Sequence, residues 1–257
     1  MASFSQSTIS DYLYRSLLIL SIVLAGRIPV LALAEEIPSA SAEIQAMIDA
    51  GQVKLEFYNP QTNPRRFVGE TKYDYNFRHT FQAEYEPVRV RGRTTSVNVR
   101  LTNVSVTAQH THTVHLPESR RGPGLWDDPL TLHEFDHVSL SIDPRIEKLL
   151  EAVLQAEDQA SFTLPPGQEV TATWVNQEID KFLSARGHAV YTVVTYNNRR
   201  LDQITEHGTK PIPNRESYFQ RLYTKPNLDE AGFSLTGEVL EFLKSEPYQM
   251  IEPRYLP

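Results

Sequence analysis

The sequence predicts an α+β fold in which a β-rich N-terminal half packs on two or three helices. Residues 53–118 are rich in Val, Thr, Tyr and Phe and nearly alternate between polar and apolar, which is typical of half-buried strands. Residues 129–205 instead carry apolar side chains at helical spacing. Because the strands precede the helices instead of alternating with them, the order indicates α+β. Residues 35–257 are long enough for a single domain.

Residues 1–34 are expected to be a signal peptide. A basic residue precedes the apolar run Ser16 to Gly26, and an A-x-A sequence ends at Ala34. This order is typical of secretory signals, so we expect cleavage near Ala34 and a secreted or periplasmic protein that meets the membrane only transiently. The alternative is a membrane anchor at residues 16–34. However, Arg27 leaves an uninterrupted run shorter than the roughly 20 residues that span a bilayer.

Composition excludes several classes of protein. The chain has no cysteine, so it forms no disulfide, no Cys-ligated zinc site and no thiol nucleophile. Its net charge is −7, and cleavage would make this −8 because residues 1–34 contain Asp11, Arg15 and Arg27. An acidic chain argues against nucleic acid as the main partner, since affinity for phosphates comes from Lys and Arg.

The first elements follow from local signals. A short helix is expected between Ser41, which can cap it, and Gly51, which can end it. The strands then extend to about residue 118, with Gly92 and Asn103 as turns or bulges. Residues 119–128 have the composition of a loop, SRRGPGLWDD.

The helices come next. Asp127 or Asp128 can cap a helix over 129–142, and Asp143 followed by Pro144 predicts a kink and a second helix over 144–156. A long apolar stripe over 169–205 predicts a third, which Gly187 bends and Gly208 terminates. One further helix is expected over 235–245.

The stretch LHEFDH contains the sequence H-E-x-x-H, formed by His133, Glu134 and His137. On a helix, residues four apart lie on one face, so the two imidazoles can aim at one point. Two neutral imidazoles suit Zn²⁺. Glu134 can reach a zinc-bound water and act as general base, which is the chemistry of peptide-bond hydrolysis.

The third zinc ligand has three candidates. We favour His207, at the C-terminal end of the long helix, because it can complete the tetrahedron if that helix packs on the first. Asp143 lies six residues after His137, but it is also a typical helix N-cap. Glu206 is the third candidate.

These residues resemble a family of bacterial proteins of unknown function described as predicted secreted zinc-dependent proteases. The resemblance covers roughly residues 125–210, and residues 138–145 depart from it. The matching residues are His133, Glu134, His137, Asp202, Thr205, His207 and Gly208. It implies a zincin-like fold and proteolysis of a polypeptide substrate.

Other polar residues receive structural interpretations. His110, His112 and His115 are expected to be surface strand residues, with a second metal site or a place beside the active cleft as alternatives. Tyr191 and Tyr196 are expected to pack in the core instead of donating to an oxyanion. The arginines that alternate with Val and Gly indicate a solvated strand face, not a nucleic-acid patch; they are Arg89, Arg91, Arg93 and Arg100.

The sequence therefore predicts an exported zinc metallopeptidase with Glu134 as the base and His133, His137 and His207 as ligands. Two alternatives stay open. One is a hydrolase of another amide bond, such as one in a cell-wall peptide. The other is a non-catalytic envelope protein with a structural metal, whose site would have four protein ligands.

Overall fold

The computed structural model describes residues 4–7, 37–156, 158–234 and 236–256. Except for residues 4–7, the expected signal peptide and the alternative anchor at 16–34 lie outside these ranges. Among the helices that are described, none combines the length and apolar character needed to cross a membrane.

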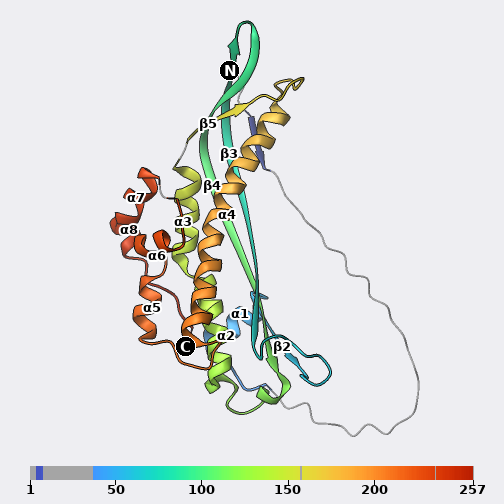
Figure 1. Ribbon diagram of the computed structural model, residues 1–257, viewed down its shortest axis with the longest axis vertical. Coiled ribbons are helices and arrows are strands. Elements are labelled where there is room, and N and C mark those ends of the chain that lie inside the picture. The colour runs from blue at the N-terminus through green and yellow to red at the C-terminus, as the bar shows by residue number, and fades with distance from the viewer. Residues whose placement is uncertain (1–3, 8–36, 157, 235, 257) are drawn as a thin grey trace, which may run out of the picture.

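The described chain forms one open sheet with mixed strand directions (Figure 1). The spatial order is β1, β3, β4, β2, and β5 pairs with β4. Only β2 runs parallel to its neighbour, which is β4. The strands are β1 Phe4–Ser7, β2 Val53–Tyr58, β3 Glu70–Val90, β4 Arg93–Pro117 and β5 Gln159–Thr163. The β-rich region is thus confirmed, although most of it is one hairpin of 21- and 25-residue strands, and β5 was not expected.

The hairpin turns and bulges at the two positions that the sequence indicated. Arg91 and Gly92 have φ values of 49° and 78°, as a two-residue turn with left-handed backbone requires. Asn103 has φ 53°, and the pairing of β3 with β4 shifts opposite it, between Thr80 and Gln82. An extra residue inserted in one strand in this way is a β-bulge.

The structure combines helices with an open sheet, as expected, and most helices follow the strands, although α1 precedes β2 and β5 lies between α3 and α4. The caps that the sequence predicted are present, because Ser41, Asp128 and Asp143 each accept a backbone N–H in the first turn of a helix. The short helices α5, α6 and α8 were not expected. The helices are α1 Ala42–Asp49, α2 Pro129–Ser141, α3 Pro144–Gln155, α4 Ala172–Thr205, α5 Arg215–Arg221, α6 Lys225–Glu230, α7 Gly237–Lys244 and α8 Glu246–Gln249.

Two groups of buried side chains hold these elements together. In the larger group, α3 and α4 pack on the hairpin and on the C-terminal helices. In the smaller group, α1, β2 and the end of β4 pack on α2. Helix α4 runs along the hairpin, so its C-terminal end comes beside α2 (Figure 1).

Gly187, which was expected to bend α4, lies against the sheet. The helix is continuous through it, and a Cβ there would lie 2.2 Å from the ring of Phe77 on β3. Glycine at this position therefore allows close contact between helix and sheet.

Candidate metal centre

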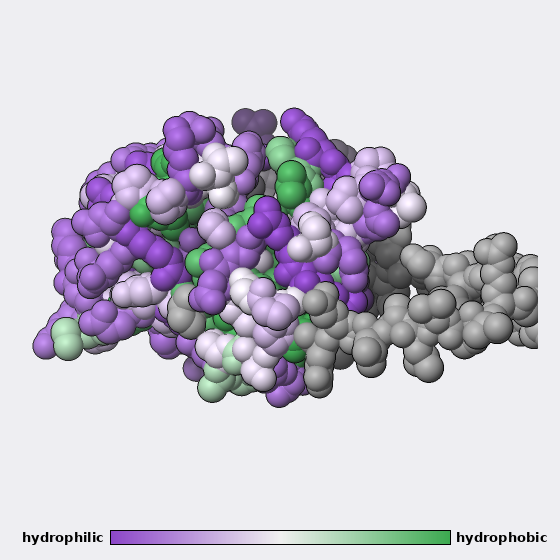
Figure 2. All heavy atoms as spheres, turned by 90° about the horizontal axis from the view of Figure 1, so that it is seen from below, coloured by the Kyte–Doolittle hydropathy of each residue, from purple (hydrophilic) through white to green (hydrophobic). Residues whose placement is uncertain are grey.

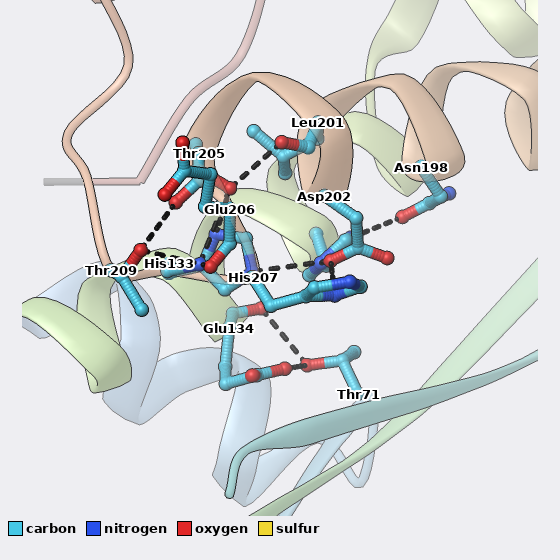
Figure 3. A network of polar contacts seen from close by, with 12 residues as sticks. Thr71, His133, Glu134, Asn198, Leu201, Asp202, Thr205, Glu206, His207 and Thr209 are labelled. Carbon is cyan, nitrogen blue, oxygen red and sulfur yellow. Dashed lines mark hydrogen bonds and ion pairs between the residues drawn. The ribbon is translucent and has the colours of Figure 1, made fainter. Parts of the chain in front are cut away.

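Two imidazoles and one carboxylate meet where α2 packs on α4. The group comprises His133 and His137 from α2 and Asp202 from α4, whose ligand atoms all lie within 4.8 Å of one another. Oδ1 of Asp202 is 3.4 Å from Nε2 of His133 and 3.2 Å from Nε2 of His137. Figure 3 shows His133 on α2 and Asp202 on α4 pointing toward one another. Two imidazoles plus one carboxylate is a donor set that divalent transition metals accept in proteins, so the group could hold a metal ion.

Asn198 fixes the orientation of His137. Its Nδ2 donates to the carbonyl oxygen of Val194, so its Oδ1 is left to accept from Nδ1 of His137 at 2.7 Å. Nδ1 therefore carries a proton, and Nε2, which lies 3.2 Å from Oδ1 of Asp202, is the nitrogen that could bind a metal ion. An imidazole held in one tautomer by an outer hydrogen bond is the usual arrangement of a metal-binding histidine.

Thr205 holds His133 in the same way. The Thr205 hydroxyl donates to the carbonyl oxygen of Leu201 at 2.8 Å, so it accepts from Nδ1 of His133, which lies 3.4 Å away. Gly208 lies against the same ring, because a Cβ on it would be 2.8 Å from the imidazole. Gly208 also has φ +79°, a left-handed conformation that glycine adopts readily. Glycine at this position therefore allows both the turn after α4 and the close approach of the backbone to His133.

Asp202 and His137 stabilise each other's charged forms. Burial raises the pKa of Asp202, but hydrogen bonds from His133 and His137 outweigh it and hold that pKa well below its ordinary value. Burial lowers the pKa of His137, but Asp202 and Glu134 outweigh it and raise that pKa above the ordinary value. The site thus favours an ionised carboxylate facing positive charge.

Glu134 lies beside the donor group and is not part of it. Its carboxylate is buried and accepts from the hydroxyl of Thr71 on β3 at 2.7 Å. Burial raises the pKa of Glu134, against the opposing effects of His137 and the Thr71 hydrogen bond. Gly69 passes so close that a Cβ on it would lie 2.3 Å from Oε1 of Glu134. Strand β3 and the loop before it therefore fix the position of this carboxylate.

A cleft of about 630 Å³ opens onto these residues. Its walls come from residues 66–73, from α2 and the segment before it, and from the end of α4. The end of the molecule that carries α1, α2 and β2 is largely hydrophilic, with smaller hydrophobic areas exposed between the polar side chains (Figure 2). The described chain has no second group of three metal-binding side chains.

The three candidates for a third ligand lie in different places. His207 lines the cleft, with Nδ1 3.3 Å from Oδ1 of Asp202, but its side chain is 56% exposed and its ring stacks on Phe67. Asp143 does not line the cleft, because it caps α3 and both its oxygens accept from Arg145. Glu206 is exposed and pairs with Lys210. The carboxylate that joins the two imidazoles is instead Asp202.

The three strand histidines are not surface residues, so that expectation is wrong. His112 and His115 are buried, and His110 is half-buried with Nδ1 2.6 Å from the carbonyl oxygen of Ser141. His112 and His115 lie where β2 pairs with β4, and His110 contacts the end of α2. None of them lines the cleft.

The expectations for Tyr191 and the strand arginines are confirmed, whereas that for Tyr196 is not. Tyr191 is buried and its ring stacks on Tyr75 at 4.7 Å, which confirms its role in the core. Tyr196 is only half-buried, with its hydroxyl near Glu230, so the same expectation is wrong for it. The four strand arginines are exposed, as expected.

Asp202 and Thr205 matched the resembled family but had no predicted role, and neither Asn198 nor Thr71 was predicted as a site residue. One signal was present. Residues 198, 202 and 205 are polar at spacings of four and three, so they share one face of α4. Two of them, Asn198 and Thr205, are buried, which a polar side chain tolerates only with a partner.

The chain matches no family model, and neither a curated protein nor a solved structure shows significant similarity to it.

Proposed function

We propose that this chain is a zinc-dependent metallopeptidase in which His133, His137 and Asp202 hold the ion and Glu134 is the general base. One observation carries the proposal. A buried carboxylate lies beside a group of three protein donors, and both open onto a cleft of about 630 Å³. A catalytic zinc site has three protein ligands and one open position, whereas a structural site has four.

The roles follow from the positions. A zinc ion in this site would supply Lewis-acid activation of water and polarise the scissile carbonyl. Glu134 takes the proton from the attacking water and returns it to the leaving amine, which is general base and then general acid catalysis. The Thr71 hydroxyl donates a hydrogen bond to Oε2 of Glu134. This bond fixes the orientation of the carboxylate and leaves Oε1 to accept the proton. His207, at the rim of the cleft, serves as an auxiliary group close to Asp202.

A polypeptide substrate suits the edge of β3. From Glu70 to His79 this strand pairs with β4 on one side only, in the part of the chain that is described. Thr71 and Tyr73, within that stretch, line the cleft. An extended peptide can therefore add to the sheet by main-chain hydrogen bonds beside Glu134. This arrangement, with H-E-x-x-H on α2 and the third donor on a later helix, supports a zincin-like architecture and the resemblance to predicted secreted proteases.

Export belongs to the same proposal. The basic flank, apolar run and A-x-A sequence support a signal peptide cleaved near Ala34, and therefore a secreted or periplasmic enzyme. Cell fractionation of the tagged chain, with N-terminal sequencing of the product, tests this. A mature N-terminus other than one near residue 35 contradicts it.

Metal analysis together with one substitution tests the catalytic proposal. Purified protein should contain about one zinc ion per chain, which elemental analysis measures. The Glu134→Ala variant should keep the ion and lose peptide cleavage. Equal turnover in the variant overturns Glu134 as the base, and retained metal with no turnover in either protein favours an envelope protein with a structural site. Parallel assays on peptidoglycan distinguish a cell-wall amide hydrolase.

A further inference from the structure

Two arginines in the cleft wall have no acidic partner. Arg66 belongs to the loop before β3 and Arg199 to α4, and both line the cleft. Both are exposed, and neither forms an ion pair with any residue that the structure describes. The guanidinium of Arg66 lies 5.1 Å from the centroid of the ring of its neighbour Phe67.

The other charges at the cleft are balanced. Arg120 pairs with Asp128, and Arg65 pairs with Glu70 at 2.6 Å. Asp202 and Glu134 are the remaining acids there, and a divalent cation beside them would offset both charges. The guanidinium groups of Arg66 and Arg199 are therefore a surplus of positive charge, on a chain whose net charge is −7.

Both arginines lie close to the donor group. Arg199 precedes Asp202 by three residues on α4, a spacing that places the two on the same side of the helix. Arg66 precedes Phe67, whose ring stacks on His207 at 4.8 Å. His207 in turn lies 3.3 Å from Asp202. One arginine thus comes from each of two walls of the cleft.

Resting on the proposed peptidase function, we infer that Arg66 and Arg199 select peptides that carry a carboxylate close to the scissile bond. A guanidinium binds a carboxylate through two parallel N–H donors, which gives direction as well as strength. The apolar side chains that line the same cleft, among them Val68 at 59% exposure, would contact the uncharged part of such a peptide. The carboxylate can belong to an acidic side chain or to the C-terminus of the peptide.

Binding is measured separately from turnover. The probes are three fluorescein-labelled Ala/Ser peptides. The first has one glutamate and an amidated C-terminus, the second has glutamine in its place, and the third has glutamine with a free C-terminal carboxylate. Anisotropy with zinc-loaded Glu134→Ala protein should show the glutamate peptide or the free-carboxylate peptide bound roughly tenfold more tightly than the uncharged one. The peptide with the higher affinity shows whether the recognised carboxylate is an acidic side chain or the C-terminus.

Substitutions link any preference to the two arginines. Arg66→Gln and Arg199→Gln should each reduce the ratio of charged to uncharged affinity, and the double variant should bring it close to one. Arg93→Gln, at the exposed hairpin turn far from the cleft, is the matched control and should leave the ratio unchanged. The preference should also weaken with added salt.

The two proposals fail in different ways. Equal affinity for all three peptides, or a ratio that the double variant leaves intact, overturns the arginine inference and does not affect the peptidase proposal. A charge preference that depends on the arginines, together with a zinc-loaded native protein that cleaves none of the three peptides, overturns the peptidase proposal and leaves carboxylate binding by the arginines intact.

Discussion

Nδ1 of His137 lies 2.7 Å from Oδ1 of Asn198, one turn before Asp202 on the same helix. Helix α4 therefore supplies both a candidate metal donor and the residue that orients an imidazole on α2.

Removal of Asn198 tests whether its hydrogen bond to His137 contributes to metal binding. Asn198→Ala should weaken zinc binding about 10- to 100-fold, since His137 loses its fixed tautomer. Asn198→Asp retains an acceptor and should restore most of the affinity. Competition titration with a chromophoric chelator measures it, and an Ala variant with native affinity contradicts the role.

Substitutions at positions 202 and 207 decide the third ligand. Asp202 approaches both imidazoles, whereas His207 is more than half exposed. Asp202→Ala should therefore abolish stoichiometric zinc, and His207→Ala should retain it. Elemental analysis after dialysis against a weak chelator gives the answer. The reverse pattern would make His207 the ligand.

The hydrogen bond from Thr71 to Glu134 should matter for turnover and not for the metal. Thr71→Val removes a donor to a buried carboxylate, so kcat/KM should fall roughly tenfold at unchanged zinc content. Thr71→Ser keeps the hydroxyl and should recover activity. Loss of metal in the Val variant would show a structural role instead.

Replacing Gly187 with alanine should destabilise the protein, although the same change inside a helix is usually stabilising. Helix propensity alone favours alanine by about 1 kcal/mol. The added methyl group would, however, collide with Phe77, so we expect Gly187→Ala to lower the free energy of unfolding by about 1–3 kcal/mol. Gly237→Ala, in α7 with no atom near the new Cβ, is the control and should be neutral or stabilising. Urea denaturation measures both.

His112 should make the fold sensitive to acid. Burial lowers the pKa of His112 to about 4, against an opposing contact with the carbonyl oxygen of Gln52. In the unfolded chain the imidazole titrates near its ordinary pKa of about 6.5. The unfolded state thus binds more protons between these values, and the free energy of unfolding falls as the pH drops from about 6.5 to 4, by about 3 kcal/mol in total.

A substitution isolates this contribution from those of other buried histidines. His112→Gln carries no titrating group, so its stability should decline less between pH 7 and pH 4.5 than that of the native chain. Urea denaturation at both pH values gives the difference. Parallel pH dependence of the two proteins contradicts the assignment.

The sequence predicted most of what local chemistry controls. Asp128–Pro129 and Asp143–Pro144 start helices because an Asp cap and a following Pro act within one turn. Gly92 and Asn103 tolerate the left-handed backbone that turns and bulges need. The pair His133 and His137 followed from helical spacing alone.

The remainder depends on how distant segments pack. Which residue of α4 faces His137 depends on the rotation of that helix against the hairpin, where Gly187 and Phe77 are in contact. The apolar periodicity predicted which face of α4 is buried. It did not predict the rotation of α4 about its axis that turns residues 198, 202 and 205 toward α2. Burial of His112 and His115 likewise depends on elements other than their own strand. For this reason the sequence assigned no role to Asp202, and it wrongly placed the strand histidines at the surface.

The donors come from two helices, and His137 and Asp202 lie 65 positions apart in the sequence. A divalent ion bound there would bridge two remote parts of a polypeptide that cannot form any disulfide. Because the unfolded chain lacks the assembled site, an ion at 100 times its Kd would stabilise the native state by about 2.7 kcal/mol. Chelation would then lower the melting temperature as well as stop catalysis, so resistance to heat and to digestion would rise with the supply of metal.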